Sequence, residues 1–273
     1  MSHYKPGKNV TDAIPYDSLG HRVDSEPIPS SEPSQVIQDS RLFYPRQNEN
    51  TTLTVDQKYL DANEYLMTHD ERGKALIINN TNFSGGLGDR EGSEVDATAM
   101  YSRLSDLGFD IELLNNASAA GIMEKLKYIA AEDHSDADCF ACVILTHGDA
   151  DGLHGTSGRL KETDIMDCFN ADKCPSLAFK PKIFIFQACR GSDPDKGKLS
   201  NRHTEKGSVY IQALSQEMMS MKSDEDFITV LTRVNRIVAH KFEHMGDDPR
   251  YQGMKQMPCF VSRLTKALRF REK

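Results

Sequence analysis

From residue 74 onward, the chain alternates short apolar runs with amphipathic segments. The apolar runs have the length of strands and lie at residues 75–78, 109–114, 139–146 and 182–186. Between the first two runs, Val95, Met100 and Leu104 place apolar side chains mainly on one side of a helix. Strands that alternate with helices are typical of a mostly parallel sheet with helices on its faces, so the pattern predicts an α/β fold.

The segments around these runs predict further helices and one more strand. Ser118 is expected to cap a helix over residues 119–131, because a serine side chain accepts a hydrogen bond from a backbone N–H of the first turn. Apolar residues at helical spacing predict helices over residues 164–170, 209–219 and 227–242. The run from Pro258 to Val261 predicts a last short strand.

Residues 1–55 differ from the rest of the chain. They contain six prolines and many Ser, Asp, Glu and Gln residues. Such a composition buries too little apolar surface to offset the entropy of ordering, so we expect a disordered leader. The first thirty residues lack the apolar stretch of a signal peptide, and no run approaches the roughly 18 apolar residues of a membrane span. We therefore expect a cytoplasmic protein.

The charge of the chain limits its partners. The formal net charge is -8, and no Lys- or Arg-rich stripe is present. Nucleic acids and anionic membranes bind basic surfaces, so neither is an expected partner. If the protein binds an acidic peptide, a few arginines must be focused in one pocket, because the overall field is unfavourable.

Two residue patterns raise the question of metal or redox chemistry. Cys139 and Cys142 have the spacing of a metal or disulfide motif, but they lie in a predicted strand and would face opposite sides of the sheet. Buried, reduced thiols are the alternative that we favour. His240 and His244 share a helix face with the spacing of an inverted zinc-protease motif, for which a solvated helix end is the alternative. We expect no cofactor and no metal.

A cysteine and a histidine each follow a predicted strand. His147 comes after the third apolar run and Cys189 after the fourth, so both are expected at the edge of the sheet where ligands bind in open α/β folds. An imidazole keeps a sulfur nucleophilic and returns the proton to a leaving amine. By itself this pair is weak evidence for catalysis, since a lone cysteine at a strand end is usually a buried thiol.

The segment around the cysteine is more specific. Gln187-Ala-Cys-Arg-Gly191 matches a signature of caspases, and His147 lies 42 residues upstream of Cys189. The chain resembles effector-type caspases from about residue 65 to 270. The matching blocks follow in order as Arg72-Gly-Lys-Ala-Leu-Ile-Ile-Asn79, Arg90-Glu-Gly-Ser-Glu-Val-Asp96, Asp133-His-Ser-Asp-Ala-Asp-Cys139, Leu145-Thr-His-Gly-Asp149, Pro181-Lys-Ile-Phe-Ile-Phe-Gln-Ala-Cys-Arg-Gly191, Gly207-Ser-Val-Tyr-Ile-Gln-Ala-Leu214 and Gln256-Met-Pro-Cys-Phe-Val-Ser-Arg-Leu-Thr-Lys-Ala-Leu268.

The resemblance implies a fold, a reaction and a set of site residues. The fold would be a three-layer α-β-α sandwich around a mostly parallel sheet, and the reaction would be cleavage of proteins after aspartate. Cys189 would be the nucleophile and His147 the acid and base, while the N–H groups of Gly148 and Cys189 would hold the oxyanion. The substrate aspartate would lie against Arg90, Gln187 and Arg202. For Arg90, the alternative is a solvated loop charge.

Two features depart from the family pattern. Only eight residues separate Gly191 from Ser200, where caspases usually have several dozen, so one strand of the small subunit is expected to be missing. Its loss would leave unpaired backbone groups at the sheet. Asn201 stands where the family commonly has tryptophan, and the chain contains no Trp.

The resemblance also implies how the protein is organised and activated. Residues 1–55 would be a short leader, 56–195 the large-subunit region and 196–273 the small-subunit region. An upstream caspase would cleave the zymogen after Asp39 and Asp195. Expected partners are protein substrates, a second copy or another caspase as dimer partner, and inhibitor-of-apoptosis proteins. A different function also fits the shortened linker, namely an inactive deletion form that pairs with a full-length caspase and regulates it.

Overall fold

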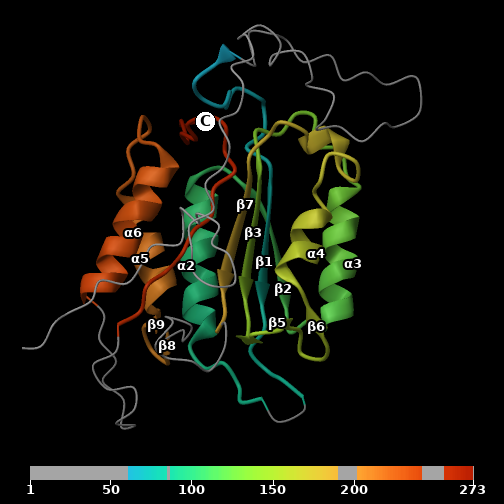
Figure 1. The fold of residues 1–273 in the computed structure, drawn as a ribbon, viewed down its shortest axis with the longest axis vertical. Helices are drawn as coiled ribbons and strands as arrows, with labels where there is room; N and C mark the ends of the chain where they lie inside the picture. The colour runs from blue at the N-terminus through green and yellow to red at the C-terminus, as the bar shows by residue number, and fades with distance from the viewer. Residues whose placement is uncertain (1–60, 85–86, 190–201, 242–254, 273) are drawn as a thin grey trace, which may run out of the picture. The chain divides into compact units, whose positions relative to one another are not determined.

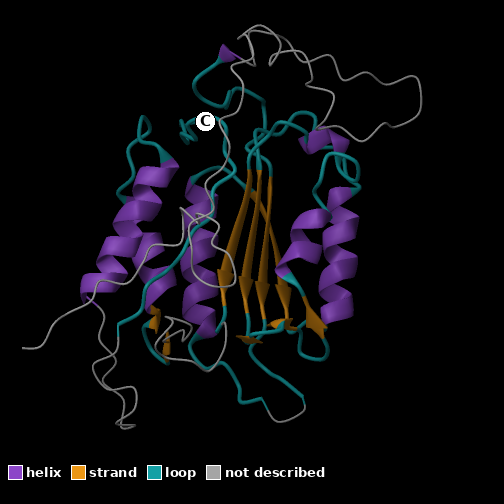
Figure 2. Cartoon of the chain, viewed as in Figure 1, coloured by secondary structure: helices purple, strands orange, loops and turns teal. Residues whose placement is uncertain are grey.

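The computed structural model describes residues 61–84, 87–189, 202–241 and 255–272. Its centre is a sheet of four parallel strands in the order β2-β1-β3-β7. These strands are β1 (Lys74–Asn79), β2 (Asp110–Asn115), β3 (Phe140–Leu145) and β7 (Lys182–Gln187). Figures 1 and 2 show them standing side by side between two layers of helices. The four strands predicted from the apolar runs are confirmed, each to within two residues at its ends.

The helices cover both faces of the sheet. One layer contains α2 (Ser93–Asp106), α5 (Val209–Met219) and α6 (Phe227–Lys241), and the other contains α3 (Ala119–Ala130) and α4 (Glu162–Asp167) (Figure 1). Each layer has its own core because successive strand residues face opposite sides. In β1, Ile77 packs in the cluster that includes Met100 of α2, whereas Ile78 packs in the cluster that includes Ile122 of α3. This arrangement is the three-layer α-β-α sandwich that the sequence predicts.

Short elements complete the described residues. They are β4 (Gly148–Asp149), β5 (Gly152–His154) and β6 (Arg159–Leu160), which form one antiparallel sheet, the hairpin of β8 (Arg202–His203) and β9 (Gly207–Ser208), and the 3-10 turn Pro175–Leu177. Ser118 caps α3 as predicted, with its side chain accepting from the N–H of Gly121. The helix predicted over residues 164–170 is shorter, because α4 ends at Asp167.

The strand predicted from Pro258 to Val261 is wrong. Within residues 255–272, the only β pairing is an isolated bridge between Ala267 and Glu64. A strand needs a neighbour for its backbone hydrogen bonds, and in the described residues β7 pairs only with β3. Val261 accordingly remains 86% exposed. In the described residues β7 is thus an edge strand, which is consistent with the expectation that the short linker removes one strand of the sheet.

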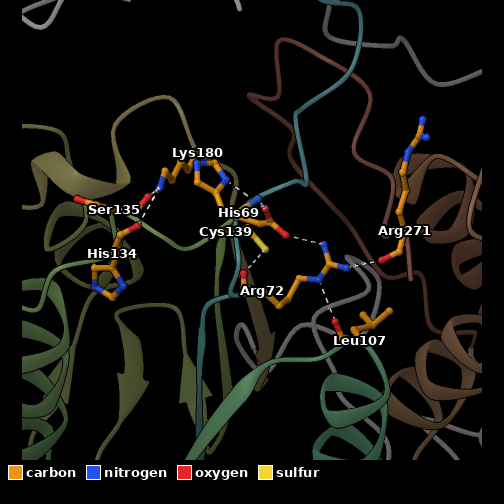
Figure 3. Close-up of polar contacts among 9 residues, drawn as sticks. His69, Arg72, Leu107, His134, Ser135, Cys139, Lys180 and Arg271 are labelled. Atoms are coloured by element: carbon orange, nitrogen blue, oxygen red, sulfur yellow. Dashed lines mark hydrogen bonds and ion pairs between the residues drawn. The ribbon is translucent and has the colours of Figure 1, made fainter. Parts of the chain in front are cut away.

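A buried polar network lies at the edge of the sheet where the strands begin (Figure 3). The Arg72 side chain donates from Nη1 to Asp138 Oδ2 at 3.0 Å and from Nε to the Leu107 carbonyl at 2.9 Å, and Nη2 donates to the Arg271 carbonyl. The Nδ1 atom of His69 lies 3.1 Å from the other oxygen of Asp138. One guanidinium therefore joins the start of β3, the end of α2 and the C-terminal segment.

Candidate active site

The pairing of β3 with β7 brings the histidine and the cysteine to one edge of the sheet. Leu145 is in register with Gln187, and the Thr146 N–H continues the ladder by donating to the Gln187 carbonyl at 3.1 Å. His147 and Cys189 each follow their strand's end by two residues, so they occupy equivalent positions on adjacent strands. Both residues are partly exposed, so a molecule in solution can reach them.

Gly148 brings its backbone directly against that of Cys189. A Cβ atom at this position would lie 2.5 Å from the Cys189 carbonyl oxygen and 3.0 Å from the Ala188 Cβ. Only glycine therefore fits without moving the end of β7. The close approach places the main chain of residues 148 and 189 in one small region, which suits paired N–H donors for an oxyanion.

The imidazole of His147 is held by a contact that the sequence did not reveal. Its Nε2 lies 2.8 Å from the carbonyl oxygen of Gly88, and the ring of Phe83 packs against it with 4.6 Å between the centroids. A carbonyl oxygen only accepts, so Nε2 carries the proton and Nδ1 is the basic nitrogen of the neutral ring. The same carbonyl would also stabilise a positively charged ring, because it accepts a hydrogen bond from either form. A carbonyl is common to every residue, so no sequence signal marks this one.

Arg90 is buried, which excludes the alternative of a solvated loop charge. Its side chain is 1% exposed, and Nη1 donates to the Asn80 carbonyl at 3.1 Å and to Ser93 Oγ at 2.6 Å. Ser93 in turn donates to Asn79 Oδ1 at 2.5 Å. The guanidinium is thus fixed between the end of β1 and the first turn of α2, at the same edge of the sheet as His147.

For the other predicted site residues, the structure describes only part of the residue or its surroundings, or does not describe the residue. Gln187 is the last residue of β7 and is 2% exposed, next to the Thr146 backbone. Arg202 lies in β8 opposite Ser208 of β9, but its side chain is outside what the structure describes. Asp39, Asp195, Asn201 and His244 also lie outside the described residues.

The remaining cysteines do not form a ligand set. Cys139 packs in the core on the α2 side of the sheet and Cys142 in the core on the α3 side, so the expected opposite orientation is confirmed. Burial raises the pKa of the Cys142 thiol, which keeps this sulfur protonated. Among the residues that the structure describes, no group of three or more His, Cys, Asp or Glu side chains is arranged to hold a metal ion.

Comparison with known proteins agrees with this geometry. The family model described as the caspase domain matches residues 72–269. The chain belongs to the caspase family. Caspase-7 of Gallus gallus is 35% identical over 246 residues, which cover 76% of this chain and 80% of the relative. Caspase-3 of Oryctolagus cuniculus is 36% identical over 246 residues, which cover 78% of this chain and 88% of the relative.

The fold comparison gives the same family. The crystal structure of caspase-1 from Spodoptera frugiperda superposes with a TM-score of 0.76 at 34% sequence identity, covering 80% of this chain and 98% of that one. The chain is therefore a caspase-type cysteine peptidase with the caspase α/β fold. Within the described residues, no helix combines the length and the apolar character that crossing a membrane requires.

Replacement of Gly148 by alanine is expected to lower peptide hydrolysis by roughly 100-fold, because a displacement of about 1 Å at a catalytic edge has an effect of that size. The new Cβ would push against the Cys189 carbonyl. Steady-state kcat/KM measures the effect. Gly121→Ala is the matched control, since its Cβ would meet only ordinary contacts of 3.4 Å or more in α3. Equal activity of the two variants would contradict the close approach at Gly148.

Proposed function

We propose that this caspase is an endopeptidase that cleaves proteins after aspartate and acts as an effector in apoptosis. The observation that supports the proposal is that His147, Cys189 and the buried Arg90 all lie at the same edge of the sheet. A nucleophile, a base with a fixed tautomer and a fixed positive charge are the three requirements for acyl transfer next to an acidic side chain.

The reaction follows from these groups. The Cys189 thiolate attacks the scissile carbonyl, and the N–H groups of Gly148 and Cys189 stabilise the resulting oxyanion. His147 Nδ1 takes the proton of the Cys189 thiol and gives it to the leaving amine as the C–N bond breaks and the thioester forms; the neutral ring then takes a proton from a water molecule, which hydrolyses the thioester and restores the Cys189 sulfur. The hydrogen bond from Nε2 to the Gly88 carbonyl orients the ring through both steps.

Selectivity for aspartate comes from charge-assisted hydrogen bonds. Arg90 and Arg202 would grip the substrate carboxylate, and Gln187 would donate a further hydrogen bond. An uncharged amide brings no negative charge to a buried guanidinium such as Arg90, so it binds there more weakly than a carboxylate does. This pocket supplies the focused positive charge that an acidic protein needs to bind acidic peptides.

Activation follows the organisation expected from the sequence. We assign residues 1–55 to a leader, 56–195 to the large subunit and 196–273 to the small subunit. An upstream caspase would cut after Asp39 and Asp195 in the cytoplasm, and the mature enzyme would pair with a second copy or another caspase. Inhibitor-of-apoptosis proteins would act on this mature form. Mass spectrometry of the active protein tests the sites, since an active form that retains residues 30–39 contradicts the cut at Asp39.

A second candidate is an inactive form that regulates a full-length caspase by dimerisation. The observation that favours it is the edge of β7, which has no second strand partner among the described residues. An enzyme needs the ordered end of this strand to present Cys189, and a missing neighbour weakens that order.

Hydrolysis of two fluorogenic peptides separates the candidates. One peptide ends in Asp and the other in the isosteric Asn. The proposal expects turnover of the Asp peptide alone, and none by the Cys189→Ala variant. Correctly folded, processed protein that hydrolyses neither peptide leaves the regulatory candidate, which binding to a full-length caspase would then support. Equal turnover of both peptides would rule out selectivity for aspartate.

A further inference from the structure

We propose that Asp96 is a positioning residue for the aspartate pocket, because its carboxylate fixes the β8–β9 hairpin against the first turn of α2. The inference rests on the proposed function, in which Arg90 and Arg202 bind the substrate carboxylate. Arg90 precedes α2, whereas Arg202 lies in the hairpin, so the two arginines come from segments far apart in the sequence. Some contact must set the distance between those segments.

The first half of that contact is the start of α2. Ser93 and Asp96 are one turn apart in this helix, and both are fully buried. Ser93 accepts from Arg90 Nη1 at 2.6 Å, so the same helical turn that holds the arginine also carries Asp96. Any segment bound to Asp96 is therefore placed relative to the Arg90 guanidinium.

The second half is the junction of β9 with α5. Asp96 Oδ1 accepts from the Ser208 N–H at 2.8 Å and from Gln212 Nε2 at 3.0 Å. Gly207 approaches so closely that a Cβ on it would lie 2.3 Å from Asp96 Oδ1, and its φ of 76° also favours glycine. The end of the hairpin and the first turn of α5 are thus bound to one carboxylate oxygen.

The strand register extends this contact to Arg202. Ser208 of β9 is in register with Arg202 of β8 in an antiparallel pair. Because the hairpin is only a few residues long, fixing Ser208 fixes the backbone of Arg202. Asp96 therefore holds together the two segments from which the arginines of the pocket come.

The Asp96 carboxylate is buried, which makes its hydrogen bonds to the hairpin and to α5 matter. Its Oδ2 atom is buried and has no hydrogen-bond partner in the part of the chain that the structure describes. Burial raises the pKa of this carboxyl, against the hydrogen bonds from Gln212 and Ser208 and the charge of Arg90, which favour the ionised form. A buried carboxylate is costly unless its hydrogen bonds are made, so the two bonds that Oδ1 accepts hold the hairpin firmly in place.

The test compares Asp96→Ala with Asp96→Asn in the processed enzyme. The alanine variant loses both hydrogen bonds of Oδ1, and we expect its KM for the Asp peptide to rise about tenfold or more, as loss of hydrogen bonds to a charged group implies. The asparagine variant keeps an acceptor oxygen, so its KM should lie close to the wild-type value. Gln212→Leu, which removes one bond from the other side, should raise KM by less than the alanine variant does.

Two further measurements separate positioning from general damage. Asp226→Ala is the matched control, because this carboxylate also accepts from a remote backbone N–H, that of Leu268 at 3.1 Å, but outside the pocket. It should lower thermal stability and leave KM unchanged. Alkylation of Cys189 by iodoacetamide, a neutral reagent that needs no aspartate pocket, should proceed at the wild-type rate in the Asp96 variants, as followed by mass spectrometry of the Cys189 peptide.

The outcomes are distinct. An unchanged KM in Asp96→Ala and Gln212→Leu, with wild-type turnover of the Asp peptide, overturns the positioning role and leaves the proposed function intact. A rise in KM that is accompanied by an equally large fall in the Cys189 alkylation rate also overturns it, because the two changes together indicate a collapsed site. If the wild-type enzyme does not cleave the Asp peptide, both proposals fail together.

Discussion

Replacement of His147 by alanine is expected to lower kcat for an Asp-terminated peptide by roughly 10²–10⁴-fold, the usual contribution of a general acid and base. The geometry gives the reason. Nε2 is committed to the Gly88 carbonyl at 2.8 Å, so proton transfer falls to the other nitrogen of a ring that is already oriented. Product formation is measured in discontinuous assays, and the concentration of Cys189 thiol is measured in the same samples. Their ratio gives kcat per competent site.

The matched control is another histidine bound to a backbone carbonyl. His134 Nε2 lies 2.8 Å from the Ile129 carbonyl, but this ring packs near Phe140, at the start of β3 and away from the catalytic edge. His134→Ala should lower stability and leave kcat within about threefold of the wild type.

A double variant of His147 and Cys189 should be no less active than the worse single variant, because the two residues act as a unit. A His147→Ala enzyme with wild-type kcat is the result that would exclude the proposed base.

The second large effect concerns stability. Arg72→Met is expected to reduce the free energy of unfolding by about 3–5 kcal/mol, because it leaves the buried Asp138 carboxylate without its main partner. The carbonyls of Leu107 and Arg271 also lose a donor (Figure 3). Urea denaturation measures the change, with Cys189→Ala as the background so that self-digestion does not interfere.

Two comparisons identify the cause of this loss. Adding Asp138→Asn to Arg72→Met should restore part of the stability, because the double variant contains no unpaired buried charge. Arg159→Met removes exposed ion pairs with Asp149 and Asp151 and should cost less than about 1 kcal/mol. If Arg72→Met lowers the free energy of unfolding by no more than Arg159→Met does, the network of Figure 3 has no special role in joining the start of β3, the end of α2 and the C-terminal segment.

Local patterns predicted most of the secondary structure. Apolar runs of strand length identified all four strands of the central sheet, helical spacing identified α2, α5 and α6, and the Ser118 cap marked the start of α3. These predictions succeed because the period of apolar residues reflects which side chains face a core. The strand predicted from Pro258 to Val261 failed for a non-local reason, since a strand forms only where another strand is available to pair with it.

The candidate site was predictable in part for the same reason. The motif around Cys189 and the position of His147 after a strand were sufficient to place both residues at one edge of the sheet. The Gly88 carbonyl, the burial of Arg90 and the contact between Asp96 and Ser208 had no sequence signal. Each depends on where the backbone of a distant segment passes.

By itself, the sequence determined the α/β class and the order of the elements, and it singled out Cys189 and His147 as the candidate nucleophile and base, because these inferences depend on residue type and local spacing. The tertiary structure alone decided which imidazole nitrogen is basic, that Arg90 is a buried charge and that Arg72 binds three segments remote from it in the sequence. Hydrogen bonds and burial of this kind arise between residues tens to hundreds of positions apart. Only folding brings such partners within reach of one another.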